Sequence, residues 1–338
     1  MERGRRMTIR EIADLAGVSI ATVSRVLNDR PDVSVATRDA VLEVAERHGF
    51  VLKRSPRGRT GLIAVTVPLI EGSYFAAMLG GIADAVEGAG MKLLLLRTGF
   101  DGARRVPLRE RLQPDSADGA VLMLPPESPV ELFELQETMP IAVIDPRVPI
   151  DEGIPCVAAT NAAGADAATE HLLGLGHRSI GVIAGPRGWA ATEERWQGYH
   201  AALARAGIGP EPRLAEFGDW EIPSGRTAAA RLLELPERPT AIFAFNDEMA
   251  IGAMLAARER GLQVPDDLSV VGFDGVERGE LLQPQLTTVR QPLAEMGRTA
   301  VSLLLRLLEH RQIEALRIGL ATRLVVREST APPSNLAS

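Results

Sequence analysis

Seven short apolar runs, separated by segments long enough for a helix, constrain the fold of this chain more than any other feature. The runs are LIAVTV (62–67), MKLLLL (91–96), GAVLML (119–124), IAVID (141–145), SIGVIAG (179–185), TAIFAF (240–245) and SVVGFD (269–274). Continuous apolar strands that alternate with helices are typical of a parallel sheet covered on both faces. Seven strands are enough for two sheets, so we predict a two-lobed, doubly wound α/β core over residues 62–330.

Polar residues stand at the ends of several of these runs. Asp145, Asn246–Asp247 and Asp274 each follow or close an apolar strand. Ligands of doubly wound sheets bind beyond the carboxyl ends of the strands, so the set predicts a binding cleft. Each residue alone could equally be a helix cap or an Asx turn, and we interpret Asp247 as the cap of the helix that follows it.

The first fifty residues have a different pattern, which predicts an all-α helix-turn-helix headpiece over residues 1–50. Thr8 and Glu11 have capping-box spacing, so a first helix should begin at Ile9. Gly17 can take a positive φ in a tight turn, and Ser19 can cap a second helix. A third helix is expected within 31–49, capped by Ser34. An ordinary helical hairpin is the alternative interpretation.

The outer face of the second helix suits the floor of a DNA groove. Its side chains are short or polar, with one guanidinium: Ile20, Ala21, Thr22, Ser24, Arg25 and Asn28. Charge is distributed accordingly, since residues 1–60 hold 12 Lys/Arg and 8 Asp/Glu while the whole chain has a net charge of −7. A basic headpiece on an acidic body indicates contact with nucleic acid through one end only.

The headpiece sequence resembles a known family. AGVSIATVSRVLN followed by VSVATRDAVLEVAERHGF is similar to the headpiece of the lac repressor (LacI/GalR) family. The resemblance implies base contacts from Ile20, Ala21 and Arg25. It implies phosphate contacts from Thr8, Ser19, Thr22, Ser24, Asn28 and Thr37.

The body resembles the effector-binding core of the same family, which is periplasmic binding protein-like. The matching segments are HLLGLGHRSIGVIAG, ERWQGYHAALARAG, PTAIFAFNDEMAIGAM, VPDDLSVVGFDG and LTTVRQPLAEMG. The resemblance implies lobe 1 at about 62–159 and 291–318, and lobe 2 at about 160–289 and 320–330, with strands crossing near 159–161, 289–291 and 318–320. It implies that these residues contact the effector: Phe75, Asp145, Arg195, Trp220, Asn246 and Asp274. Arg147, Arg187 and Trp189 are additional candidates, and core packing is an equal alternative for Trp189 and Trp220.

The linker over 51–61 departs from the family pattern. The family has an aromatic-x-Pro-Asn segment and a leucine here, whereas this chain has GFVLKRSPRGRTGLI. Pro56 and Gly58 would break a hinge helix, so we expect a basic arm in which Lys53, Arg54 and Arg57 contact DNA. The alternative is that Val51 and Leu52 replace the missing wedge. Residues 331–338 are expected to be a disordered tail.

The sequence gives little support for an enzyme, a metalloprotein or a membrane protein. No glycine-rich nucleotide loop and no G-x-S-x-G motif occurs, and we expect no enzyme, although Asp145 and Asp274 could be mistaken for a glycosidase pair. The five His and the lone Cys156 lack metal-ligand spacing, so neither a metal nor a cofactor is expected. Cys156 is interpreted as a small buried hydrophobe. No apolar run reaches membrane length and no signal peptide precedes the headpiece, which indicates a cytoplasmic protein.

Together these features favour a sequence-specific DNA-binding transcriptional regulator. The preferred interpretation is a homodimeric repressor of carbohydrate-utilisation genes that binds double-stranded operator DNA and is released by a sugar bound between the lobes. The alternatives are an activator or corepressor-dependent regulator of the same family, and a sugar-binding protein without a regulatory role.

Overall fold

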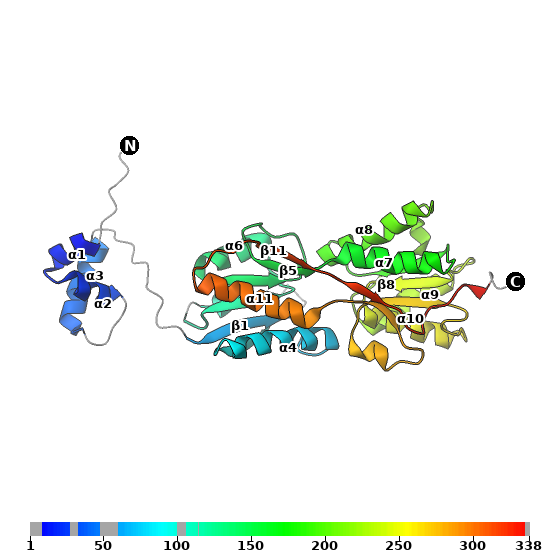
Figure 1. Ribbon diagram of the computed structural model, residues 1–338, viewed down its shortest axis with the longest axis horizontal. Coiled ribbons are helices and arrows are strands. Elements are labelled where there is room, and N and C mark those ends of the chain that lie inside the picture. The colour runs from blue at the N-terminus through cyan, green and yellow to red at the C-terminus, as the bar shows by residue number, and fades with distance from the viewer. Residues whose placement is uncertain (1–8, 28–32, 48–59, 100–105, 114, 335–338) are drawn as a thin grey trace. The chain divides into compact units, whose positions relative to one another are not determined.

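The computed structural model describes residues 9–27, 33–47, 60–99, 106–113 and 115–334 (Figure 1). The chain divides into two compact units, residues 1–61 and residues 62–338. The expected linker contacts Lys53, Arg54 and Arg57 lie outside the described residues, as do Thr8 and Asn28.

The first unit contains three helices, α1 (Ile9–Ala16), α2 (Ile20–Leu27) and α3 (Val35–Arg47). Each contributes to a small apolar core whose fully buried members are Ile12, Ala13, Val23, Val26, Val41 and Ala45. Because these residues recur at helical spacing, each helix buries one face and leaves the opposite face to solvent.

Local chemistry fixes the turn between α1 and α2. Gly17 has a φ of 65° and the Val18 amide donates to the Ala13 carbonyl at 3.0 Å, which is the hydrogen bond of a Schellman C-cap. The Ser19 hydroxyl then accepts from the Thr22 amide at 3.0 Å and so caps α2. Ser34 caps α3 in the same way at 3.2 Å, through the Thr37 amide. The predicted turn and both predicted caps are therefore present.

The second unit begins with a six-stranded sheet of order β11-β5-β4-β3-β1-β2, in which all pairs are parallel. Its strands are β1 (Leu62–Val67), β2 (Lys92–Arg97), β3 (Gly119–Met123), β4 (Ile141–Ile144), β5 (Cys156–Ala159) and β11 (Arg317–Leu320). Helices α4 (Ser73–Gly88) and α11 (Leu293–Leu308) pack on one face, whereas α5 (Leu108–Arg111) and α6 (Pro129–Thr138) pack on the other. The alternating side chains of β1 and β3 enter these two cores in turn, as a sheet covered on both faces requires.

A second six-stranded sheet has the order β12-β10-β9-β8-β6-β7. Its strands are β6 (Ile180–Ala184), β7 (Ala215–Phe217), β8 (Ala241–Ala244), β9 (Ser269–Asp274), β10 (Thr287–Arg290) and β12 (Arg323–Val325), and β12 alone is antiparallel. The helices are α7 (Asn161–Gly174), α8 (Ala190–Arg205), α9 (Ile222–Leu233) and α10 (Asp247–Glu259), with the short turns η2 (Pro212–Leu214) and η3 (Glu277–Glu280). Figure 1 shows α7 and α8 together on one side of these strands and α9 and α10 on the other.

Three segments connect the sheets, and two of them are joined to each other. The chain passes from β5 to α7 at Thr160, from β10 to α11 at 291–292, and from β11 to β12 at 321–322. The Thr322 amide donates to the Thr160 hydroxyl at 3.0 Å, which holds the first and third crossings side by side. The first crossing lies where the family resemblance implied, and the second and third lie slightly later in the chain.

The last described residues belong to the second lobe. Ala331 donates its amide to the Ser269 hydroxyl at 3.0 Å, and its carbonyl lies 2.9 Å from the buried His177 ring. The expectation of a disordered tail from residue 331 is therefore wrong for Ala331, because these hydrogen bonds tie it to β9. Among the described residues no helix is long and apolar enough to cross a membrane.

Candidate functional site

The exposed face of α2 is the candidate nucleic-acid interface. Ile20 has 52% of its surface exposed, and the Arg25 side chain is also exposed. Neither belongs to the apolar core, in which Val23 and Val26 of the same helix are buried. The side chains of Ala21 and Ser24 lie outside the described part of the structure.

Paired hydroxyls mark the N-termini of α2 and α3. The Ser19 and Thr22 hydroxyl oxygens lie 2.8 Å apart, and those of Ser34 and Thr37 are also 2.8 Å apart. A helix N-terminus presents amide donors and a partial positive charge, which favours phosphate oxygens. The positions expected to hold phosphates therefore have suitable local chemistry at Ser19, Thr22 and Thr37.

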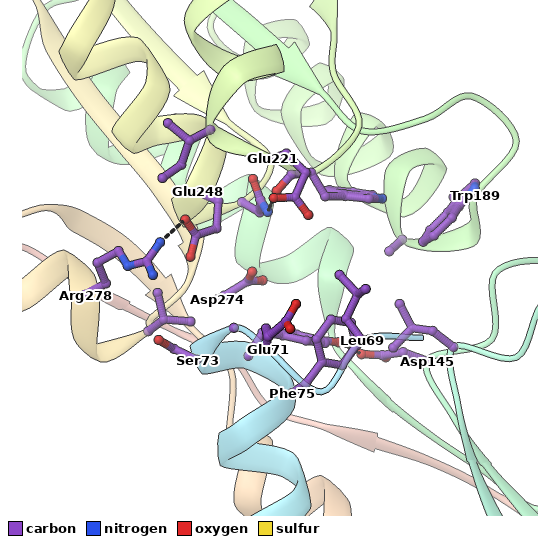
Figure 2. A pocket seen from close by; sticks show the side chains of 18 of the residues that line it. Leu69, Glu71, Ser73, Phe75, Asp145, Trp189, Glu221, Glu248, Asp274 and Arg278 are labelled. Atoms are coloured by element: carbon purple, nitrogen blue, oxygen red, sulfur yellow. Dashed lines mark hydrogen bonds and ion pairs between the residues drawn. The ribbon is translucent and has the colours of Figure 1, made fainter. Parts of the chain in front are cut away.

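A cavity of about 590 Å³ lies between the two lobes of the second unit (Figure 2). Its walls come from loops and helix ends beyond the carboxyl ends of β1, β3, β4, β6, β7, β8 and β9. All six expected effector contacts line it: Phe75, Asp145, Arg195, Trp220, Asn246 and Asp274.

The wall from lobe 1 centres on a hydrogen bond between Tyr74 and Asp145. The Tyr74 hydroxyl donates to Asp145 Oδ2 at 2.5 Å. Burial and the neighbouring Asp145 charge raise the pKa of Tyr74 well above its usual value, and burial also raises the pKa of Asp145. The adjacent Phe75 ring packs edge-on to Tyr74 at a centroid distance of 5.2 Å. This wall therefore offers one half-buried carboxylate and two aromatic rings.

Arg195 on α8 is the central cation of the cavity, and only 4% of its surface is exposed. Its Nε donates to Asn161 Oδ1 at 2.9 Å, and Nη1 donates to the Phe245 carbonyl. Nη1 also lies 3.8 Å from Asp274 Oδ1, and the guanidinium lies 3.7 Å from the centroid of the Phe273 ring. These partners fix the guanidinium in one orientation.

Asp274 closes β9 and is joined to the second crossing. Its Oδ1 accepts from Gln291 Nε2 at 2.7 Å, and its carbonyl accepts from the Gln291 amide at 3.0 Å. Burial raises the pKa of Asp274 well above its ordinary value, although Arg195 opposes this shift. Because Arg195 is itself joined to Asn161 at the first crossing, two crossings contact the cavity through hydrogen bonds.

The start of α10 corrects one sequence interpretation. Asn246, not Asp247, is the N-cap, because Asn246 Oδ1 accepts from the Met249 amide at 2.9 Å. Asp247 is fully buried as the first helical residue. Its two oxygens accept from the Thr288 hydroxyl at 2.5 Å and from the Val276 amide at 2.8 Å, so it supports the loop that follows Asp274. The two residues are adjacent and both can cap, so the sequence alone did not distinguish them.

Trp220 stands where the chain leaves β7. Its carbonyl accepts from Asn246 Nδ2 at 2.8 Å, and its ring lies so close to Gly185 that a Cβ added there would be 2.1 Å from two ring carbons. Its buried indole N–H has no hydrogen-bond partner among the described residues. Trp189, also on the cavity wall, has its ring centroid 5.9 Å from that of Trp220.

Backbone strain is concentrated around this cavity. Leu124, Asp145, Trp220 and Asp274 all have positive φ values, of 44°, 47°, 75° and 118°. All four line the cavity, and the described chain contains only one other non-glycine residue with positive φ. Left-handed backbone at non-glycine residues is costly and clusters at functional sites, so this independent observation also marks the cavity as functional.

The sequence missed several lining residues. Tyr74, Glu71, Glu221, Glu248 and Arg278 also line the cavity; none of them follows a strand directly, and only Glu248 stands in a segment that matches the family. Of the additional candidates, Trp189 lines the cavity. Arg187 instead lies over the Phe217 ring at 3.7 Å and is absent from the cavity wall. Arg147 donates to the Leu124 carbonyl at 2.9 Å, behind the wall.

The arrangement of groups suits a ligand rich in hydroxyls. Carboxylate and carbonyl oxygens accept, guanidinium and indole N–H groups donate, and aromatic rings cover apolar ligand faces. No group of three or more His, Cys, Asp or Glu residues with metal-binding geometry occurs in the described part of the chain. Cys156 is buried, as expected, and burial raises its pKa to about 11.

Two family models match the chain. The model described as bacterial regulatory proteins, lacI family, matches residues 8–52, and the periplasmic binding protein-like domain matches residues 169–330. The chain is 33% identical to the ribose operon repressor of Halalkalibacterium halodurans over 332 residues, covering 97% of this chain and 98% of that protein.

Solved structures give the same result. A complex of the transcriptional regulator CelR with cellobiose superposes with a TM-score of 0.74 at 34% identity, covering 96% of this chain and 100% of that one. The lac repressor dimer bound to operator superposes with a TM-score of 0.71 at 28% identity, covering 97% and 100%.

Proposed function

Because the chain belongs to the lacI family of bacterial regulatory proteins and is a DNA-binding transcriptional regulator, we propose that it is a repressor released from its operator by a sugar. The observation that carries this proposal is the interlobe cavity, which gathers Asp145, Arg195, Asn246 and Asp274 around two aromatic walls. Fixed donors and acceptors beside apolar rings match the alternating hydroxyls and C–H faces of a sugar.

The DNA contacts of this proposal lie on α2 and at the helix N-termini. Ile20, Ala21 and Arg25 read bases, while Ser19, Thr22 and Thr37 hold phosphates, together with Thr8, Ser24, Asn28, Lys53, Arg54 and Arg57. The chain acts as a homodimer, so that two recognition helices meet successive major grooves of a palindromic operator. The protein is located in the cytoplasm, where it has access to operator DNA.

Release is transmitted through the crossings. Asn161 at the first crossing is bonded to Arg195, and Gln291 at the second is bonded to Asp274. A sugar that engages both side chains stabilises one arrangement of the lobes over another. The sugar shifts the operator-binding equilibrium only by its difference in affinity for the two arrangements.

The cavity carboxylates serve binding rather than catalysis in this proposal. Asp145 accepts from Tyr74 and Asp274 accepts from Gln291, so each is held by a neighbour. A sugar-hydrolysis assay on the candidate ligands tests this directly, and turnover above background would contradict it.

The full chain tests the proposal in two steps. First, an operator is enriched from random duplexes and its affinity is measured by fluorescence anisotropy. Second, pentoses, hexoses, disaccharides and phosphorylated sugars are added separately. We expect tight sequence-specific binding and release by a small set of sugars. A chain that binds the operator but responds to no saccharide would contradict the effector class.

A further inference from the structure

We propose that the effector is an uncharged saccharide of at least two sugar rings, an inference that rests on the proposed function. Trp189 together with Trp220 provides a platform for two rings, and the carboxylates at the cavity mouth exclude phosphorylated ligands. Both features come from this cavity and are independent of each other.

The two tryptophans form a continuous apolar surface. Their ring centroids are 5.9 Å apart and their planes are tilted by 51°. They come from different elements, since Trp189 precedes α8 and Trp220 precedes α9. Each indole can cover the apolar C–H face of one sugar ring.

The lining of the cavity extends beyond the polar cluster that grips a first ring. In Figure 2, Trp189 and Arg278 lie toward opposite ends of the view, with Asp274 between them. Arg195, Asn246 and Asp274 suffice to orient one ring. Trp189 is then available for a second ring.

Trp189 is held in place before any ligand binds. The Arg147 guanidinium lies over its ring, 4.8 Å from the centroid, and Nε of Arg147 is fixed by the Leu124 carbonyl. The Ala190 amide, next to Trp189, donates to the Arg147 carbonyl at 2.7 Å. A rigid aromatic side chain loses little conformational freedom on binding, so it favours a ligand long enough to reach it.

Charge at the cavity argues against anionic ligands. Among its described lining residues are five carboxylates and two guanidiniums, those of Arg195 and Arg278. Arg195 is engaged by Asn161, Phe245 and Asp274, and Arg278 donates to Glu248 Oε2 at 2.8 Å. A phosphate would therefore have to break an existing ion pair before it gained a cation.

The mouth adds direct repulsion. Glu71 from lobe 1 and Glu221 from lobe 2 are both exposed and face each other across the cavity in Figure 2. The pKa of Glu221 is raised by partial burial and by the carboxylates of Asp219 and Glu248. The carboxylates of Glu71, Glu221 and Glu248 give this part of the cavity a negative potential, which disfavours phosphate and uronate groups.

The first experiment is calorimetry of the full chain with a saccharide panel. The panel contains pentoses, hexoses, the disaccharides built from them, and the 6-phosphates of the hexoses and of the disaccharides. We expect the tightest ligand to be an uncharged disaccharide or longer, bound at least about tenfold more tightly than its component monosaccharide. A monosaccharide or a phosphorylated sugar as the tightest ligand would overturn the inference while leaving the proposed function intact. Absence of binding by every saccharide would overturn both.

The second experiment uses two matched pairs of variants. Trp189→Leu should weaken disaccharide binding about tenfold and monosaccharide binding far less, whereas Phe133→Leu on the exposed face of α6 should change neither.

The second pair tests charge. The double variant Glu71→Gln, Glu221→Gln should strengthen binding of the phosphorylated disaccharide several-fold, and Glu137→Gln should not. Equal losses for both ligands in Trp189→Leu, or no gain in the double variant, would contradict the corresponding half of the inference. The melting temperature of each variant is measured, and affinities are compared only for variants whose melting temperature is close to that of the parent.

Discussion

The Arg195 guanidinium lies 3.8 Å from the Asp274 carboxylate, and the two residues are only 4% and 6% exposed. Each is also bonded to a different interlobe crossing, Arg195 to Asn161 and Asp274 to Gln291. A ligand hydroxyl that hydrogen-bonds to both side chains therefore acts on two residues that are each bonded to a different crossing. This relationship links the chemistry of the cavity to the arrangement of the lobes.

Replacing Arg195 should separate effector binding from DNA binding. Arg195→Ala removes the donor to the Phe245 carbonyl and the cation beside Asp274, so we expect effector binding to weaken by about 1–3 kcal/mol, or roughly fivefold to 150-fold. Calorimetry with the tightest sugar measures this. Arg226→Ala breaks an exposed ion pair with Glu259 and should change affinity little. Normal sugar affinity in Arg195→Ala would refute the role of Arg195.

Gly185 tests the placement of Trp220. Gly185→Ala puts a Cβ 2.1 Å from two carbons of the Trp220 ring, which must then move out of the cavity wall. We expect sugar affinity to fall because the displaced ring no longer covers the ligand, and the free energy of unfolding to fall by about 1–3 kcal/mol, the usual size of an overpacking effect. Gly174→Ala is the matched control, since a Cβ there meets nothing within 4 Å. If both variants bind sugar like the parent, Trp220 does not form part of the site.

The fold was predictable where strands are apolar and central. The runs at 62–67 and 269–274 are β1 and β9 with the same bounds, because both strands are buried on both faces. The strand at 287–290 was missed, since its sequence TTVR is polar. Burial of Thr287 and Thr288 depends on partners far along the chain, such as Asp247 and Ser329, and no local pattern reports such contacts.

The candidate site was only partly predictable. Asp145 and Asp274 were found because they end apolar strands, whereas Arg195 came from the family resemblance. Tyr74 gave no signal, because its partner Asp145 is 71 positions away in the sequence and nothing local distinguishes Tyr74 from a core residue. The linker contacts remain predictions, since they lie outside the described residues.

Asp247 should make the stability of the core depend on pH. Burial raises its pKa from 3.8 to about 7, against the opposing hydrogen bonds from Thr288 and Val276. The folded protein thus keeps a proton that the unfolded chain has already lost, so the free energy of unfolding falls as pH rises from about 4 to about 7. The stabilisation from the proton on Asp247 is fully present below the pKa of Asp247 in the unfolded chain, and it is lost as pH rises above the pKa of Asp247 in the folded protein.

Denaturation of Asp247→Asn at a series of pH values measures this effect. Because the amide cannot ionise, the variant should gain stability relative to the parent as pH rises, by up to about 1.4 kcal/mol per pH unit. Asp84→Asn, at an exposed position on α4, should follow the parent curve. Parallel curves for Asp247→Asn and the parent would show that Asp247 does not titrate in this range.

Arg25 should determine base preference in the operator. It is exposed on α2, and arginine reads guanine through two parallel hydrogen bonds in the major groove. Arg25→Ala should weaken operator binding by about 1–3 kcal/mol per half-site and relax the preference at one base pair. Arg25→Lys keeps the charge but loses the planar pair of donors, so this variant should lose base preference more than it loses operator affinity. Binding to a full set of single-base operator variants measures both, and an unchanged preference at every position would falsify the assignment.

The central claim is that sugar binding in the interlobe cavity and operator binding by the headpiece oppose each other. Thermodynamic linkage requires this coupling to be reciprocal, so the most direct measurement is sugar affinity by calorimetry with the operator absent and with the operator saturating. The account predicts that the operator weakens sugar binding by the same factor by which the sugar weakens operator binding, on the order of five- to a hundredfold. Equal sugar affinity with and without the operator would contradict it.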